Sequence, residues 1–168
     1  MRILALIGSK KKYSLILLAF LFFPSLVCAE PSLIVRPQVG YGYFDSSASN
    51  DDGSAYHVGA RILLNVGAIR RYGLEISQFN IEHGGDFTSL GIVLEQRLLG
   101  WFNMSLGTVG YFGYSVDLEN PVGLMTNLGW EPVLDNPFQP FITYRNDIIF
   151  SNKIDTVHSL SIGVTCEF

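Results

Sequence analysis

Hydrophobic residues alternate with small or polar residues over most of the chain beyond residue 30. The alternation is clearest in the last stretch, 157–168, where Leu160, Ile162, Val164, Cys166 and Phe168 are separated by serine, glycine, threonine and glutamate. A period of two is typical of a β-strand with two different faces. No helical periodicity interrupts the pattern between residues 30 and 168, which predicts an all-β domain.

The alternation divides this domain into eight segments separated by turn-rich breaks. We predict strands at 33–44, 56–66, 72–82, 88–98, 101–115, 122–131, 138–150 and 157–168. The third strand changes phase, because Phe79 and Ile81 have the opposite parity to its first half, and this predicts a β-bulge near Ser77–Gln78. An even number of strands, with polar and mostly acidic breaks after odd strands and short or basic ones after even strands, favours an antiparallel up-and-down barrel.

The two faces of the strands decide whether such a barrel is soluble or spans a membrane. A lipocalin-type barrel has an apolar interior and a polar exterior. Here the apolar face carries bulky Leu, Ile, Phe and Tyr residues, which are too large for the narrow interior of eight strands. More than half of the 17 glycines have the polar parity: Gly40, Gly42, Gly59, Gly73, Gly91, Gly107, Gly113, Gly123, Gly129 and Gly163. We therefore expect the apolar face to lie outside, against lipid.

Charged residues on the strands share the polar parity and are expected inside the barrel, where opposite charges pair. On the lipid side, each Arg or Lys near mid-membrane would cost about 2–4 kcal/mol. Two interpretations remain open for this lumen, an ion-conducting pore and a structural plug of salt bridges, and we favour the plug. The predicted lumen charge network comprises Arg36, Arg61, Glu75, Glu95, Arg97, Glu131, Arg145, Asp147 and Glu167.

Composition agrees with a membrane barrel. Hydrophobic residues make up 48% of the chain and charged residues 15%, yet after the first thirty residues no apolar run approaches the roughly 20 that a membrane helix needs. Aromatic residues gather near the predicted strand ends, as expected of the two interfacial girdles of such a barrel.

Residues 1–29 have the features of a signal peptide. A basic region with Arg2 and 10–12 precedes an apolar core at 14–27, and small residues precede a predicted cleavage after Ala29. An uncleaved anchor and a lipoprotein modified at Cys28 are the weaker alternatives. The predicted barrel domain is then 30–168.

Cleavage would also change the charge and the cysteine content. It leaves seven Lys and Arg against 15 Asp and Glu, a formal charge of −8, and such an acidic chain disfavours nucleic acid as a partner. Only Cys166 would remain, so no intramolecular disulfide is expected.

The alternating C-terminal stretch resembles the assembly signal of bacterial outer-membrane barrels at Leu160, Ile162, Val164 and Phe168, and the Gly-Tyr-Gly-Tyr of residues 40–43 adds to this likeness. The whole predicted barrel resembles the small OmpA/OmpX/opacity-type proteins. The resemblance implies an eight-stranded antiparallel transmembrane barrel in the outer membrane of a Gram-negative-type bacterium. Its partners would be outer-membrane lipids, lipopolysaccharide and the barrel-assembly machinery, and we expect a monomer.

Several functions fit this resemblance. We favour a structural or surface-interaction role without catalysis or cofactor, and a small passive pore is one alternative. A second alternative is a lipid A-modifying enzyme, because residues 150–152 resemble the end of the His-x-Ser-Asn motif of lipid A 3-O-deacylases. However, Ile149 stands where that motif has its histidine, and nothing in the sequence brings His57, His83 or His158 to Ser151.

A third hypothesis is an adhesin or an anchor held by divalent cations bridging acidic loops to lipopolysaccharide phosphates. The sequence contains no zinc-ligand spacing, phosphate-binding glycine loop or nucleotide fingerprint. The acidic residues expected at the outer rim are Asp45, Asp51, Asp52, Glu82, Asp86, Asp117, Glu119 and Asp155.

Overall fold

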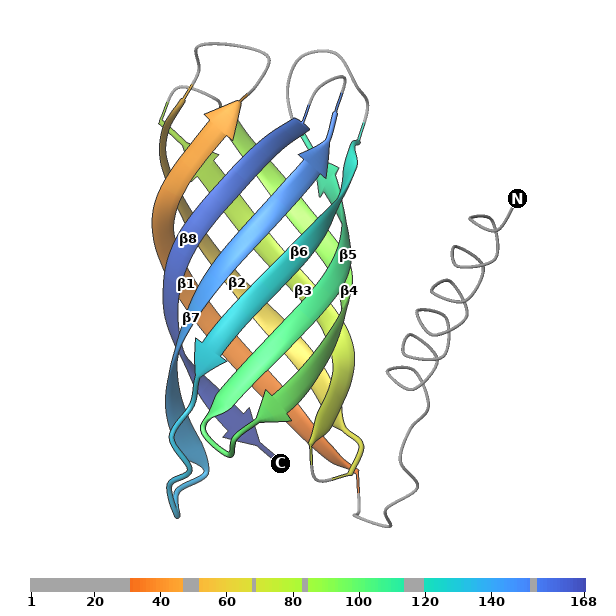
Figure 1. Ribbon diagram of the computed structural model, residues 1–168, viewed down its shortest axis with the longest axis vertical. Coiled ribbons are helices and arrows are strands. Elements are labelled where there is room, and N and C mark those ends of the chain that lie inside the picture. The colour runs from red at the N-terminus through yellow and green to blue at the C-terminus, as the bar shows by residue number, and fades with distance from the viewer. Residues whose placement is uncertain (1–30, 47–51, 68, 83–84, 114–119, 152–153) are drawn as a thin grey trace, which may run out of the picture.

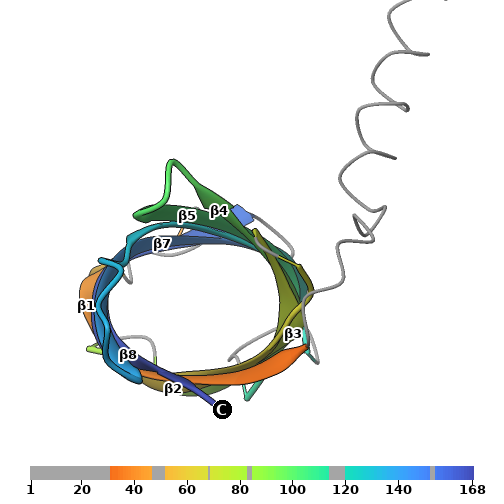
Figure 2. The same cartoon turned by 90° about the horizontal axis from the view of Figure 1, so that it is seen from below.

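Eight antiparallel strands form a closed barrel in the computed structural model, which describes residues 31–46, 52–67, 69–82, 85–113, 120–151 and 154–168. Each strand pairs with its neighbours in sequence, and β8 pairs with β1 to complete the ring (Figures 1 and 2). The strands are β1 (Ser32–Ser46), β2 (Gly53–Asn65), β3 (Arg70–Ile81), β4 (Gly85–Leu98), β5 (Phe102–Phe112), β6 (Val122–Trp130), β7 (Phe138–Phe150) and β8 (Ile154–Glu167).

This architecture confirms the predicted fold class and all eight predicted strands. The main differences lie at the loop ends, where β2, β4 and β8 begin about three residues earlier than the alternation indicated and β5 ends at Phe112. The predicted signal peptide, residues 1–29, lies outside the described residues. No helix among the described residues is long and apolar enough to cross a membrane.

The connections fall into two groups at opposite ends of the barrel. The start of β1 and the end of β8 lie at the same end as the turns after β2, β4 and β6 (Figure 1). We call this the turn end and the opposite one the loop end. The turn after β4 is tight, since Leu99 and Gly100 both have positive φ and the Trp101 amide donates to the Leu99 carbonyl over 2.8 Å.

The apolar face lies outside the barrel, as predicted. The side chains of Ile92, Leu106 and Ile162 are 70, 51 and 55% exposed, whereas those of Arg61 and Arg145 are buried inside. Exposed aromatic residues lie near both ends, including Tyr43 and Phe150 at the loop end and Trp101 and Trp130 at the turn end.

The predicted bulge in the third strand is wrong. Both ladders of β3 run without interruption through Ser77 and Gln78. Phe79 and Ile81 are buried because they continue the inward parity of Glu75 and Ser77. The apparent phase change reflects a change in what fills the interior, from polar to apolar, while the backbone stays regular.

The ring has one interrupted ladder, at the seam between β1 and β8. The register pairs Val35 with Cys166 and Gln38 with Gly163, but no pair forms at Arg36 or Pro37 between them. On its other side Pro37 still pairs with Ala60 of β2. Proline has no N–H to donate to a ladder, which explains why the seam is open at this level.

Candidate functional site: the barrel interior

Glu95 lies at the centre of the charged interior in the half near the turn end. Its Oε2 accepts a hydrogen bond from Arg36 Nη1 over 2.6 Å, and its Oε1 accepts one from Arg71 Nη1 over 2.9 Å. Arg61 Nη1 is 3.6 Å from the same carboxylate. One buried carboxylate is thus surrounded by three guanidinium groups, and these opposite charges offset the cost of its burial.

Glu131 forms a second acidic centre beside it, just beyond the end of β6. Its Oε2 accepts hydrogen bonds from Arg71 Nη1 over 3.0 Å and from Asn103 Nδ2 over 3.2 Å. Arg36 and Arg97 approach the same oxygen to 3.7 and 3.8 Å. The Arg97 side chain is 25% exposed and is the most accessible member of the network.

Glu75 forms a third centre, deeper in the barrel. Arg61 Nε donates to its Oε2 over 2.5 Å, and Arg145 Nη1 pairs with its Oε1. Ser77 Oγ donates to the same Oε1 over 3.3 Å, and Arg145 Nε donates to Asp147 Oδ2 over 2.8 Å. Because Arg61 contacts both Glu75 and Glu95, the charged groups form one continuous network.

Aromatic rings cover two of these guanidinium groups. The Arg36 guanidinium carbon lies 4.1 Å from the centre of the Phe141 ring, and that of Arg145 lies 4.9 Å from the Phe79 ring. Cation–π contacts of this kind are stronger where water is excluded. Ion pairs and rings together fix the orientation of the two arginines.

Eight of the nine residues predicted for the lumen network lie in it: Arg36, Arg61, Glu75, Glu95, Arg97, Glu131, Arg145 and Asp147. Glu167 does not. Its side chain is exposed at the turn end and accepts a hydrogen bond from Ser32 Oγ over 2.5 Å. Glu167 has the inward parity, but it is the last residue of β8 and lies beyond the enclosed part of the barrel, so alternation predicted its position wrongly.

Arg71 belongs to the network, although the sequence analysis did not place it there. It lies in what looked like a basic turn, yet β3 begins at Arg70 and directs Arg71 inward. Its parity is that of Glu75 on the same strand, and this signal was available in the sequence.

The loop-end half of the interior is filled by apolar and aromatic side chains, which the sequence analysis did not predict. The Phe79 and Phe87 rings stack with their centres 4.8 Å apart, and Tyr111 meets Phe87 edge-on at 5.7 Å. Such ring pairs stabilise a core beyond the area they bury. The whole apolar cluster comprises Phe44, Ala55, Phe79, Ile81, Phe87, Val93, Val109, Tyr111, Met125, Ile149 and Val157.

His57 lies between the apolar cluster and the ion pairs. Its Nε2 is 3.0 Å from Ser161 Oγ and 3.2 Å from Ser159 Oγ, and its ring stacks on Phe79 with centres 4.8 Å apart. The side chain is only 3% exposed. A histidine beside two serines has the parts of a nucleophilic pair, but burial separates this one from any external substrate.

The deacylase-like segment does not form a catalytic arrangement. Ser151 Oγ donates to Asp155 Oδ2 over 2.9 Å, and Ile149 is buried in the apolar cluster. His57 contacts serines of β8, and His158 Nδ1 is 2.8 Å from the Tyr144 hydroxyl. His83 lies outside the described residues.

The structure supports the predicted acidic outer rim only in part, because not all of its residues are exposed. Asp155 is buried and accepts a hydrogen bond from Ser46 Oγ over 2.9 Å, and Asp52 accepts one from the Ser46 amide over 3.0 Å. Asp86 Oδ1 accepts a hydrogen bond from the side-chain Nδ2 of Asn80. Asp51, Asp117 and Glu119 lie outside the described residues, and no cluster of three or more metal-ligating side chains occurs in the described part of the chain.

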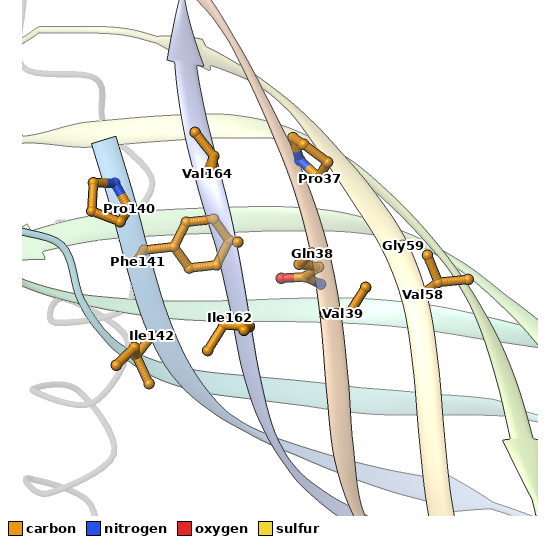
Figure 3. A pocket seen from close by; sticks show the side chains of 11 residues that line it. Pro37, Gln38, Val39, Val58, Gly59, Pro140, Phe141, Ile142, Ile162 and Val164 are labelled. Carbon is orange, nitrogen blue, oxygen red and sulfur yellow. The ribbon is translucent and has the colours of Figure 1, made fainter. Parts of the chain in front are cut away.

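An apolar groove of about 490 Å³ lies on the outer surface across β7, β8, β1 and β2. Pro37 and Pro140 lie on either side of Val164, and Ile142 and Ile162 continue the lining along β7 and β8 (Figure 3). Val164 and Ile162 belong to the predicted assembly signal, whose other members, Leu160 and Phe168, are also exposed.

A closed eight-stranded antiparallel ring is the fold of the small outer-membrane β-barrels. Among solved structures, the chain is similar to Neisserial surface protein A, with a TM-score of 0.61 and 16% sequence identity over 81% of this chain and 97% of that chain. Identity this low shows the fold alone.

Two further solved structures are similar to the chain at lower TM-scores. One is Ail of Yersinia pestis, determined with the heparin analogue sucrose octasulfate, with a TM-score of 0.46 and 10% identity over 82% of this chain and 98% of Ail. The other is a de novo designed transmembrane β-barrel, with a TM-score of 0.47 and 12% identity over 82% of this chain and 95% of the design. At the level of sequence, the chain matches no protein-family model and no curated protein.

Proposed function

We propose that the mature chain is an integral barrel of the outer membrane of a Gram-negative-type bacterium, with a plugged interior and a structural or surface-interaction role. Its signal peptide directs export, the barrel-assembly machinery inserts it, and outer-membrane lipids and lipopolysaccharide surround it. The observation that supports the membrane location best is the predominantly apolar exposed outside of the strands, with aromatic residues near both ends.

The plugged interior is supported by two layers that exclude water for different reasons. Near the turn end the carboxylates of Glu75, Glu95 and Glu131 are engaged by guanidinium groups. Near the loop end, stacked aromatic rings and the rest of the apolar cluster fill the interior. An eight-stranded ring has space for side chains and little else.

Conductance measurements test the plug. Purified, folded protein in planar bilayers should show no stable conductance. A Phe79→Ala/Phe87→Ala variant, which removes two rings from the apolar cluster, should show a measurable leak and serves as the positive control. A large and stable conductance from the unmodified protein would contradict the proposal.

Fractionation tests the location. The protein should appear in outer-membrane fractions, without residues 1–29, and migrate differently on gels when folded and when boiled. Loss of the gene should increase the sensitivity of cells to detergent if the barrel supports the envelope. Recovery of the protein in the soluble fraction would overturn the membrane assignment.

The absence of catalysis is part of the proposal and has its own test. The described histidines contact serines inside the barrel or a tyrosine outside it, and none of these contacts involves Ser151. Mass spectrometry of lipid A from cells with and without the protein should give the same profile. A lost acyl chain would revive the deacylase hypothesis.

A further inference from the structure

A band of polar aromatic side chains lies on the outer surface of β7, β8, β1 and β2, toward the loop end. The register joins its members across the strands, since Tyr41 pairs with Tyr56 and Tyr43 pairs with His158. The tyrosines of the band are 46 to 64% exposed, so their rings and hydroxyls are accessible from outside the barrel. We call this surface the tyrosine band, and it comprises Tyr41, Tyr43, Ser54, Tyr56, Tyr144 and His158.

The tyrosine band offers neutral hydrogen-bonding groups. The Tyr41 hydroxyl donates to Ser54 Oγ over 3.0 Å, and the Tyr144 hydroxyl lies 2.8 Å from His158 Nδ1. A hydroxyl donates one hydrogen bond and accepts two, so these groups retain capacity for a ligand. Within the described ranges, no outward residue of the four strands is lysine or arginine. The surface therefore lacks the cations that a phosphate group pairs with best.

The apolar groove lies directly beside the tyrosine band, on the same four strands. Val39 and Ile142, which line the groove, are two residues from Tyr41 and Tyr144 on the same outward face (Figure 3). Gln38 also lines it, but the polar atoms of its side chain have almost no exposed surface. The surface is thus polar toward the loop end and hollow and apolar toward the turn end.

This order of polarity matches an amphiphile of the outer leaflet. In outer-membrane barrels the longer loops face outside and the short turns face the periplasm, so the tyrosine band lies on the external side of the groove. Ser54 is the second residue of β2, and Tyr43 is three residues from the end of β1. This part of the band is close to the loop-end rim, the level at which lipid headgroups begin.

A second copy of the chain fits this surface less well than a lipid does. A two-fold axis would place the groove of one barrel against the same groove of the other. Two facing hollows, each of about 490 Å³, would leave an unfilled cavity, and cavities between packed surfaces are destabilising. A flexible acyl chain adapts to the hollow and fills it.

We propose that this surface binds one glycolipid of the outer leaflet, with a sugar of its headgroup on the tyrosine band and one acyl chain in the groove. Lipid A, an acylated glucosamine disaccharide, has this chemistry. Its sugar hydroxyls and amides can pair with the tyrosine, serine and histidine side chains, and its acyl chains contribute by burial in the groove. The inference rests on the membrane location proposed above and adds to it a fixed site for a single lipid.

Native mass spectrometry of the folded barrel, purified from outer membranes in mild detergent, tests the site. Lipid A or phosphatidylglycerol is added at the same concentration, and the fraction of chains carrying one lipid is measured. Two or more hydrogen bonds to the sugar should make the lipid A fraction roughly five- to tenfold higher. Equal fractions for the two lipids, no lipid A adduct, or a lipid-free complex of two chains would each overturn the proposal.

Filling the groove tests the place of the acyl chain. Ile162→Trp puts a larger side chain into the groove, and Ile92→Trp adds the same side chain on the far side of the ring, where Ile92 is 70% exposed. Ile162→Trp should lower the lipid A fraction roughly tenfold, and Ile92→Trp should leave it unchanged. Val39→Trp replaces Ile162→Trp if that variant fails to fold. Equal lipid A binding by the groove-filling variant and the control would refute the groove as the acyl site.

Removal of hydroxyls tests the place of the sugar. Tyr41→Phe combined with Tyr43→Phe keeps both rings, and it should lower the lipid A fraction roughly five- to tenfold while the phosphatidylglycerol fraction stays the same. Thr88→Val combined with Gln78→Leu is the control, because it removes a hydrogen-bonded polar pair from the far side. An equal loss for both lipids, or no loss for lipid A, would contradict the sugar site.

The membrane location is judged separately, from the fraction of cells that yields the protein. Recovery in outer membranes without a lipid A adduct would refute only the lipid site. Recovery in the soluble fraction would refute the membrane location itself.

Discussion

Glu75 is the residue on which the deeper part of the interior depends. Its two oxygens are shared between Arg61 and Arg145, and Ser77 donates to it as well. The carboxylate is 2% exposed, so no solvent could replace it as a partner of the two cations. Because all of these groups are buried, removing any one of them would leave an uncompensated charge on its partners.

Replacing Glu75 by glutamine should therefore destabilise the barrel strongly. The substitution keeps the shape but leaves two buried guanidinium groups without their shared carboxylate, and removal of one partner from a buried pair costs about 3–5 kcal/mol. Urea unfolding of the refolded protein measures the loss. Glu167→Gln, at the exposed end of β8, is the matched control and should change the free energy of unfolding little. Equal effects of the two substitutions would contradict the assignment.

Gly73 shows why glycine occupies inward positions. A Cβ at this position would overlap the backbone carbonyl oxygen of Ile62 and lie 2.8 Å from the Cα of Leu63 on the neighbouring strand. Backbone in a paired strand cannot move aside as a flexible side chain can.

Gly73→Ala should lower the free energy of unfolding by about 1–3 kcal/mol, the usual cost of overpacking. Gly110→Ala is the control, because a Cβ there would lie 3.5 Å from the Phe112 ring and 3.9 Å from the Leu90 carbonyl oxygen, both ordinary contacts. Unfolding midpoints in urea compare the two. A Gly73→Ala variant as stable as the control would show that the strands have more freedom than the structure indicates.

At the scale of elements, the seam between β1 and β8 is the place where the ladder of the ring is interrupted. Every other pair of neighbouring strands has an unbroken register, whereas this one lacks pairs at Arg36 and Pro37. Arg36 directs its side chain into the charge network, where it pairs with Glu95 and approaches Glu131. These ion pairs anchor β1 to the barrel interior at the level where its ladder with β8 is interrupted.

Pro37→Val should close this gap. Valine supplies the missing N–H and suits an outward position, and a ladder hydrogen bond contributes about 0.5–1.5 kcal/mol. We expect a higher urea midpoint and slower amide exchange at residues 163–166. Pro140→Val, which lies beyond the paired end of β6, should have a smaller effect. A destabilised Pro37→Val variant would mean that the proline is required for the local geometry.

β3 illustrates how far the sequence pattern can be taken for an element. Its position and pairing followed from alternation, but the inward Phe79 and Ile81 looked like a slip in register. A prediction from alternation alone takes each face of a strand to be either polar or apolar along its whole length. The interior instead changes from ion pairs to aromatic rings between the two ends, and only the three-dimensional arrangement shows this change.

At the scale of the whole molecule, the barrel should sit in the bilayer with its two tryptophans at one interface. Trp101 and Trp130 are 59 and 41% exposed, and both lie at the turn end. Aromatic residues at such positions favour the headgroup level.

Quenching by brominated lipids measures this depth. Bromine near the headgroups should quench the fluorescence of the reconstituted protein more than bromine near the ends of the acyl chains. Trp101→Phe and Trp130→Phe variants, each with one tryptophan left, should behave alike. Fluorescence unaffected by any brominated lipid would contradict insertion, and stronger quenching from the chain ends would contradict the proposed orientation.

The sequence by itself determined the number of strands, their closure into an antiparallel ring and which face turns outward, because a period of two records the two environments of a strand directly. It also identified most of the charged residues that form the ion pairs, since charges with inward parity have no other stable position. Tertiary structure decided which arginine meets which carboxylate, that Arg71 joins them and Glu167 does not, and that aromatic rings fill the loop end. These depend on the stagger between strands far apart in the chain, which brings Arg36 to Glu95 and His57 to Ser161, and no local pattern encodes that stagger.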